Sequence, residues 1–265
     1  RLSFTELDAA SDQLACQLLD RGISTGDRVI VQLPNIVELV VCYMAFSKIG
    51  AIISPVPVQY GSHELQHISA TISPVAIVTL NRFGALELAK TAESIANGSV
   101  QLLVFGTDLN ITSTLDPEKC LQVRSHQDRY PTGADHILTI SWTSGTTGTP
   151  KGVPRSHNMW VATARCCAEA GNYKQGDRFL NIFPLVNMAS IGGFLYPALL
   201  LGCSIILHHP LDPGLYLTQL QNEKVTFTIA PPMLLNQLAK SQDMWNQFDF
   251  SQLRSIGSGS APLAP

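Results

Sequence analysis

Short apolar segments that alternate with segments of helical spacing are the feature that most constrains the fold of this chain. Residues 27–34, 51–56, 75–80 and 101–106 are apolar runs of strand length, and helix-like segments lie between them. Strands that alternate with helices in this way pair in parallel, and the helices cover both faces of the sheet. The sequence therefore predicts an α/β protein built from mostly parallel sheets flanked by helices.

The alternation is interrupted once and then resumes. Residues 107–135 are polar and contain Pro117, Pro131 and Gly133, so we expect a long surface connection there. Further strands are expected at 136–142, 178–183, 203–207, 225–230 and 253–257. Asp212 followed by Pro213 predicts the start of a helix between two of them.

The length of the chain, 265 residues, is sufficient for two compact units with their own cores. We expect two stacked subdomains, each a mostly parallel sheet flanked by helices. The first spans residues 27–171, and the second combines residues 1–26 with residues 172–265.

The composition excludes several classes of protein. Charged residues make up 14% of the chain, the net charge is −3 and no basic patch appears, so nucleic-acid binding has little support. The longest apolar stretch, Phe194 to Leu207, contains a proline and a glycine and is too short to span a membrane. The six cysteines include no CxxC pair, which favours reduced, mostly buried thiols in a cytoplasmic protein. The oligomeric state is open, with a homodimer as one option.

A loop rich in glycine and hydroxyl groups, "SWTSGTTGTPKGV" at 141–153, follows one expected strand and leads to a helix. Glycines allow a tight turn that directs several backbone N–H groups at one anion, and hydroxyl groups add donors. Lys151 supplies a positive charge, which at about 4 Å is worth roughly 4 kcal/mol against a phosphate oxygen at an effective dielectric constant near 20. Pro150 precedes this lysine, so the loop is not a Walker A sequence. The pattern predicts a phosphate-binding loop of another kind.

Residues 143–153 of this loop resemble the signature loop of the adenylate-forming superfamily, which contains acyl- and aryl-CoA synthetases, luciferases and peptide-synthetase adenylation domains. Five further stretches resemble the same enzymes in the same order: 2–35, 45–79, 154–160, 183–203 and 255–263. The resemblance therefore covers almost the whole chain. It implies the fold of an acyl-CoA synthetase-like amino-terminal domain.

The resemblance also implies an activity. These enzymes attack the α-phosphate of ATP with a carboxylate, release pyrophosphate, and pass the acyl group to a thiol, usually that of coenzyme A. The implied cofactors are ATP, Mg²⁺ and coenzyme A, the implied substrate is a small carboxylic acid, and fatty-acid metabolism is the expected setting. Lys151 and Thr147 would be catalytic, and the triphosphate would be held by Thr143, Ser144, Gly145, Thr146, Thr147, Gly148 and Lys151.

Two other segments carry implied binding residues. The adenine would lie against Gly259, Ser260, Ala261 and Pro262, where Ser260 replaces the more common glycine. Asn187 stands where many relatives have histidine, and it cannot carry a positive charge. Met188, Gly192 and Gly193 would line or flank the acyl pocket, where the glycines leave room for a bulky acyl group; helix packing is the alternative for Met188.

Three alternatives stay open at this point. The first is an aryl-acid adenylating ligase within the same superfamily. The second is a module that binds a nucleotide or an acyl group without turnover, because the Tyr-Gly-x-Thr-Glu segment, the ribose-binding Asp and the lid domain with its lysine, all carried by relatives, are not in this chain. We therefore expect a fragment of a longer enzyme that by itself binds ATP weakly and catalyses little. The third is a zinc peptidase, because His63, Glu64 and His67 match H-E-x-x-H; no third ligand follows, and we expect no metal site.

Overall fold

The computed structural model describes residues 1–96, 98–143, 150–240, 245–259 and 261. The chain divides into two compact units, Arg1–Met159 and Trp160–Pro265. The boundary lies within helix α6 (His157–Ala170) and not at residue 171. The first helix also belongs to the first unit, where it packs against α2 and α5, and Leu14 and Leu18 on its inner face are fully buried.

The first unit alternates strands with helices as expected, and its elements are α1 (Phe4–Asp20), β1 (Arg28–Gln32), α2 (Val37–Ile49), β2 (Ile52–Pro55), α3 (Ser62–Ile72), β3 (Ala76–Leu80), α4 (Leu88–Ala92), β4 (Gln101–Phe105), α5 (Pro117–Arg129), β5 (Ile137–Thr143) and β6 (Lys151–Ser156). Helix α1 begins with a capping box in which Ser3 and Glu6 satisfy each other's backbone N–H groups.

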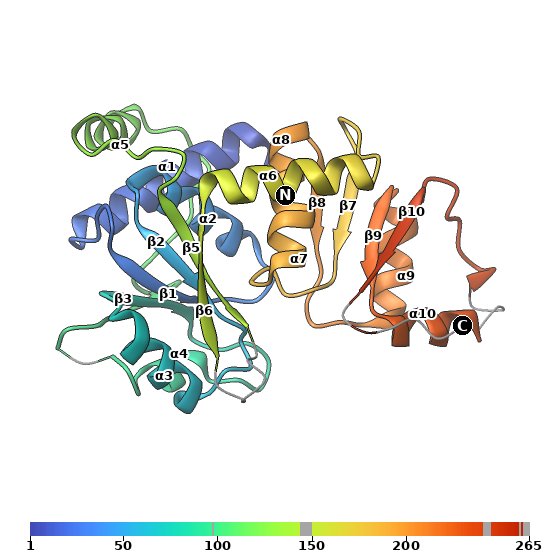
Figure 1. Cartoon of the computed structure of the whole chain (residues 1–265), viewed down its shortest axis with the longest axis horizontal. Helices are drawn as coiled ribbons and strands as arrows, with labels where there is room; N and C mark the ends of the chain where they lie inside the picture. The colour runs from blue at the N-terminus through green and yellow to red at the C-terminus, as the bar shows by residue number, and fades with distance from the viewer. Residues whose placement is uncertain (97, 144–149, 241–244, 260, 262–265) are drawn as a thin grey trace. The chain divides into compact units, whose positions relative to one another are not determined.

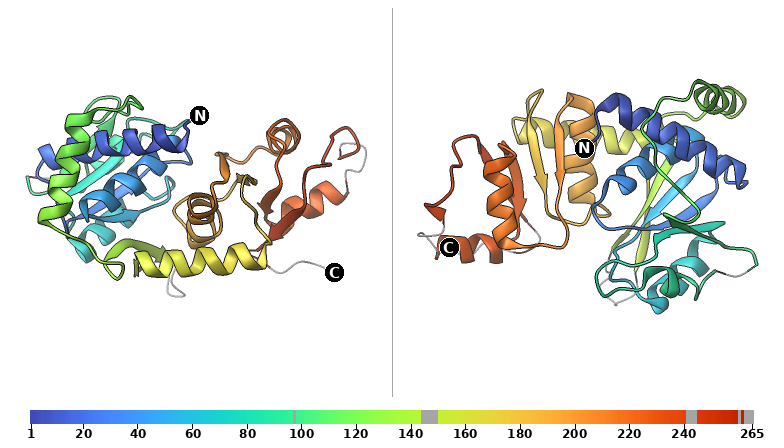
Figure 2. Two further views of the ribbon diagram at one scale, coloured as in Figure 1. Left: turned by 90° about the horizontal axis from the view of Figure 1, so that it is seen from above. Right: turned by 180° about the vertical axis from the view of Figure 1, so that it is seen from behind.

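The six-stranded sheet of this unit has the order β4-β3-β1-β2-β5-β6. All neighbours are parallel except β5 and β6, which are antiparallel. The chain moves from β1 to β2 in one direction along the sheet and then returns past β1 to β3. Because such crossovers are right-handed, α2 lies on one face and α3 and α4 lie on the other. Figure 1 shows α3 and α4 on one side of the sheet with α1 and α5 on the other, and Figure 2 shows α1 and α5 side by side.

Two elements of the first unit were not predicted. The expected surface connection at 107–135 contains the helix α5, whose N-cap is Asp116 and whose first residue is Pro117. The residues after the glycine-rich loop form the edge strand β6 before the helix begins. Strand β6 contains Pro154, and an edge position tolerates a residue without an N–H group because one side of the strand has no partner to bond.

The second unit contains β7 (Arg178–Asn181), α7 (Met188–Ser190), the π-helical turn η1 (Ile191–Leu195), α8 (Tyr196–Leu201), β8 (Ser204–Leu207), α9 (Pro213–Asn222), β9 (Phe227–Ala230), α10 (Pro232–Ala239) and β10 (Ser255–Ser258). The sheet order is β10-β9-β7-β8, and all its pairs are parallel. The order repeats that of β4-β3-β1-β2 in the first unit.

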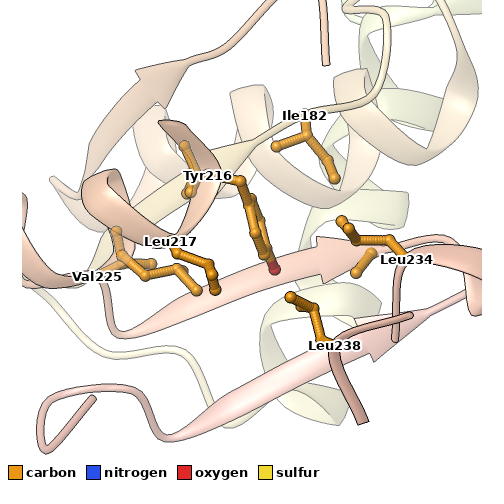
Figure 3. Packing of buried hydrophobic residues seen from close by; sticks show 9 residues of the cluster. Ile182, Tyr216, Leu217, Val225, Leu234 and Leu238 are labelled. Carbon is orange, nitrogen blue, oxygen red and sulfur yellow. The ribbon is translucent and has the colours of Figure 1, made fainter. Parts of the chain in front are cut away.

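Two apolar clusters form the core of the second unit. In the first cluster, helices α9 and α10 pack together through Tyr216, Leu217, Leu234 and Leu238 (Figure 3), and Leu220 belongs to the same cluster. Phe194 and Ala198 of the segment η1–α8 pack with Phe179 and Phe227 of the strands in a separate cluster. The sheet is therefore covered on both faces, as expected of a parallel sheet. Within the described residues, no helix has the length and the apolar character required to cross a membrane.

The six cysteines provide a test of this packing. All are free; Cys16 and Cys42 are buried, whereas Cys166 is exposed on α6. Burial raises the pKa of the Cys16 thiol to about 11 and also raises that of Cys42. Because the thiolate is the reactive form, we expect iodoacetamide at pH 8 to modify Cys166 in the native protein and to modify Cys16 and Cys42 only in denaturant. Peptide mapping after timed labelling measures this order, and early modification of Cys42 would contradict the fold.

Candidate functional site

The antiparallel hairpin β5–β6 places the two ends of the glycine-rich loop next to each other. Thr143, the last residue of β5, is paired with Lys151, the first residue of β6. Both side chains are exposed, and residues that are directly opposite in a ladder project from the same face with Cβ atoms roughly 5 Å apart. A hydroxyl group and an ammonium group therefore lie side by side where an anion can reach them. Ser144, Gly145, Thr146, Thr147 and Gly148 lie outside the described residues.

Tight packing fixes the base of this hairpin. The indole Nε1 of Trp142 donates a hydrogen bond of 2.8 Å to Oγ of Ser54, which is fully buried on β2. Gly152 lies opposite Trp142, and a Cβ atom there would be 2.9 Å from Ile140 Cγ2 and 3.2 Å from Trp142 Cη2. A glycine is therefore needed beside Lys151 so that the strand can lie close to the indole ring. Trp142 and Gly152 hold the base of the hairpin.

The two histidines of the H-E-x-x-H pattern have different surroundings. The side chain of His63 is 94% exposed and lies 3.9 Å from the Glu64 carboxylate. His67 is half-buried, and its Nε2 donates a hydrogen bond of 3.0 Å to the carbonyl oxygen of Pro150. Among the residues that the structure describes, no group of three or more His, Cys, Asp or Glu side chains could hold a metal ion. The pattern therefore does not form a zinc site of that kind in the described part of the chain.

Asn187 is the N-cap of α7. Its Oδ1 accepts a hydrogen bond of 2.9 Å from the backbone N–H of Ser190, and its backbone is extended, as capping requires. The hydroxyl group of Ser190 donates in turn to Asn181 Oδ1 at 3.0 Å. The amide at position 187 thus has a local structural role, which a short polar acceptor performs well. Met188 is 46% exposed, so it does not fill a helix core.

The two glycines that follow differ from each other. A Cβ atom at Gly192 would lie 2.6 Å from Thr163 Cγ2 of α6, so the space beside this glycine is already occupied. In this direction Gly192 leaves no room for an acyl group, because it packs closely against α6. A Cβ atom at Gly193 would have no described neighbour within 4 Å, and the Gly193 carbonyl accepts a hydrogen bond of 3.3 Å from the Tyr173 hydroxyl group. Only the space beside Gly193 is open.

These glycines lie in η1, the π-helical turn between α7 and α8. A single π turn widens the helix locally and is found at functional sites more often than elsewhere. Gly192 and Gly193 are both buried, so the open space beside Gly193 lies beneath the surface of the unit. A methyl group added at Gly193 would therefore meet no described atom within 4 Å.

The expected adenine segment follows β10. Gly259 is half-buried, directly after Ser258, and a Cβ atom there would have no described neighbour within 4 Å. Ala261 is exposed, and Ser260 and Pro262 lie outside the described residues. The segment begins at the carboxyl end of a parallel strand, the edge of an α/β sheet where ligands commonly bind.

The model of the AMP-binding enzyme family matches residues 1–265, which is the whole chain. The chain belongs to the AMP-binding enzyme family. It is 28% identical to the feruloyl-CoA synthase of an Amycolatopsis species, over 99% of this chain and 50% of the relative. It is 28% identical to 4-coumarate–CoA ligase 3 of Arabidopsis thaliana, over 95% of this chain and 45% of the relative. The chain thus spans about half the length of the curated relatives it matches.

Solved structures agree with the fold of this AMP-binding chain. It matches the N-terminal domain of FACL13 from Mycobacterium tuberculosis with a TM-score of 0.78 and 24% identity, over 100% of this chain and 64% of that one. The predicted α/β architecture with mostly parallel sheets is therefore confirmed. The sequence analysis did not identify the packing roles of Ser54 and Thr163, which belong to no motif, and it considered His67 only as part of the H-E-x-x-H pattern.

The difference between Gly192 and Gly193 can be tested by comparing the stability of variants with alanine at each position. We expect Gly192→Ala to lower the free energy of unfolding by roughly 1–3 kcal/mol, because the new methyl group would overlap with Thr163. Gly193→Ala is the matched control and should not destabilise, since its methyl group enters open space and alanine favours helix. Urea unfolding measures both.

A second substitution separates this clash from a general effect of alanine. Thr163→Ser removes the Cγ2 methyl group and keeps the hydroxyl group, so it should restore most of the stability that Gly192→Ala removes. Equal stability of the two alanine variants, or no recovery in the double variant, would contradict the packing role of Gly192.

Proposed function

We propose that this chain is the amino-terminal part of an enzyme that activates a carboxylic acid with ATP and transfers the acyl group to coenzyme A or another thiol. Membership of the AMP-binding enzyme family supports the first step. The relatives named feruloyl-CoA synthase and 4-coumarate–CoA ligase support the second. The observation that carries the proposal is the pairing of Thr143 with Lys151 at the two ends of the signature loop.

The chemistry explains why a cation should lie there. A carboxylate oxygen forms a bond to the α-phosphorus of ATP, the bond from that phosphorus to the β-phosphate oxygen breaks, and pyrophosphate leaves with the electron pair. Two anions must approach each other, so electrostatic stabilisation is the main contribution that the protein can make. The ammonium group of Lys151 offsets charge on the phosphates, and the hydroxyl group of Thr143 donates a hydrogen bond to them. Thr147 and its loop neighbours would add further donors.

Mg²⁺ is part of the proposal as the cation that would accompany ATP and offset phosphate charge. Among the residues of this chain, the hydroxyl groups of the glycine-rich loop, such as that of Thr143, would be its candidate protein partners. The reaction would take place in the cytoplasm, where both ATP and coenzyme A are available.

The acyl group would lie beside the segment 187–193. Gly193 faces open, buried space, so its position suits contact with an apolar acyl chain or ring. Asn187 would act through its cap on α7 and not as a cation. The two relatives described above are named for aromatic acids, so an aryl acid is the first candidate and a fatty acid the second. Gly259 and Ala261, with Ser260 and Pro262, would border the adenine.

The role of Lys151 is tested by Lys151→Ala in the complete protein that carries this chain. Hydroxamate trapping across a panel of aromatic and fatty acids reports acyl-adenylate formation. We expect about a 100-fold loss in rate, typical for removal of one group that stabilises developing charge. Lys174→Ala removes an exposed lysine far along the sequence and should leave the rate unchanged. An unchanged rate in Lys151→Ala would refute the role of this residue.

The acyl position is tested by Gly193→Val in the same assay. A branched side chain would fill the open space beside η1, so the KM for bulky acids should rise about 10-fold or more, while that for acetate should change little. The KM for ATP should stay the same. A uniform loss of activity with all acids would indicate a folding defect instead of a change in acyl selectivity.

A further inference from the structure

We propose that His67 is a positioning residue that holds both ends of the signature loop and thereby sets the location of Lys151. The effect of His67 on catalysis rests on the proposed function, whereas its role in holding the hairpin does not. One imidazole contacts the residue before Thr143 and the residue before Lys151, which are Trp142 and Pro150. These two contacts form the basis of the inference.

The helix that carries His67 is firmly anchored. Leu65, Ile68 and Ile72 of α3 are buried against Ile30 and Ile77 of the sheet. The start of the helix is fixed as well, because the Glu64 carboxylate accepts a hydrogen bond of 2.9 Å from the backbone N–H of Gly61. These contacts do not involve His67. Helix α3 therefore keeps its place when the imidazole is replaced.

The segment before α3 is tied to the centre of the sheet. The buried side chain of Gln32, at the end of β1, donates hydrogen bonds to the carbonyl groups of Pro57 at 3.2 Å and Tyr60 at 2.9 Å. The segment that leads into α3 is thus held in place by β1, through Gln32. His67 projects from a rigid platform toward the hairpin.

The contact with Pro150 lies at the point where the described ladder ends. The last pair between β5 and β6 is Thr143 with Lys151, and Pro150 is one residue beyond it. Its carbonyl oxygen can only accept a hydrogen bond, so His67 must carry a hydrogen on Nε2 and donate it over 3.0 Å. This bond fixes the peptide unit that joins Pro150 to Lys151.

The contact with Trp142 secures the other strand. The rings of His67 and Trp142 meet edge to face, with 6.4 Å between centroids and 73° between planes. The indole also donates to Ser54 Oγ, so His67 on one side and β2 on the other restrict its ring. Thr143 follows directly in the chain. His67 therefore holds both residues of the Thr143–Lys151 pair through the residues that precede them, Trp142 and Pro150.

The test compares three variants of the complete protein. His67→Leu removes the donor; His67→Gln keeps an amide N–H at about the same distance from the backbone; His63→Leu alters the exposed histidine of the same helix and is the matched control. We expect the KM for ATP to rise about 5- to 10-fold in His67→Leu, to recover largely in His67→Gln, and not to change in His63→Leu. The KM for the carboxylic acid should stay the same in all three.

A second readout does not depend on catalysis. Hydrogen exchange of the backbone amides of Lys151 and Gly152 should be about 5- to 10-fold faster in His67→Leu than in the wild type or in His63→Leu. Unchanged exchange together with an unchanged KM for ATP would overturn the inference. A parallel loss for ATP and acid with a lowered melting temperature would also overturn it, because His67 would then be merely structural. If exchange responds but Lys151→Ala leaves the rate unchanged, the proposed function fails and the positioning of the hairpin stands.

Discussion

The antiparallel pairing of β6 with β5 is the constraint on which the candidate site depends. In the rest of the sheet, a helix-containing connection separates each strand from the next strand in the chain, so the residues at the carboxyl ends of these strands stay far apart in sequence. Here the chain reverses and returns along β5. The glycine-rich loop therefore leaves and re-enters the sheet at one place, and Thr143 and Lys151 become direct neighbours. A hydroxyl group and a cation separated by eight positions in the sequence can then act on the same anion.

The fold could be predicted where burial leaves a periodic signal. The buried strands and the helices between them are evident because their apolar residues repeat along the chain, and parallel pairing follows from the alternation. Helix α5 was missed because, among its residues, all of which the structure describes, only Val123 is buried. Its Asp116-Pro117 start has the same form as the Asp212-Pro213 start of α9, which was recognised. The only sequence evidence for α5 was therefore its capping signal, because α5 has no apolar face.

The site could be predicted in its residue types and not in its packing. The family resemblance implies which residues would lie near a ligand, yet it treats Gly192 and Gly193 alike. The structure separates them because Thr163, from a different helix, occupies the space beside one and not the other. Likewise, the replacement of histidine by Asn187 has a simple local reason, since an amide oxygen caps α7. Such distinctions depend on long-range contacts, which no local sequence pattern contains.

The H-E-x-x-H pattern shows why spacing alone does not determine chemistry. Helix geometry places His63 and His67 on one face whatever their role. A structural zinc site needs several ligands that converge on one point, but His63 is almost fully exposed, Nε2 of His67 is hydrogen-bonded to Pro150, and the described residues bring no third ligand to the pair. The same five residues thus contain one histidine in contact with solvent and one in contact with the hairpin. What distinguishes the two histidines is Pro150, the residue directly before strand β6, and the sequence did not predict that strand.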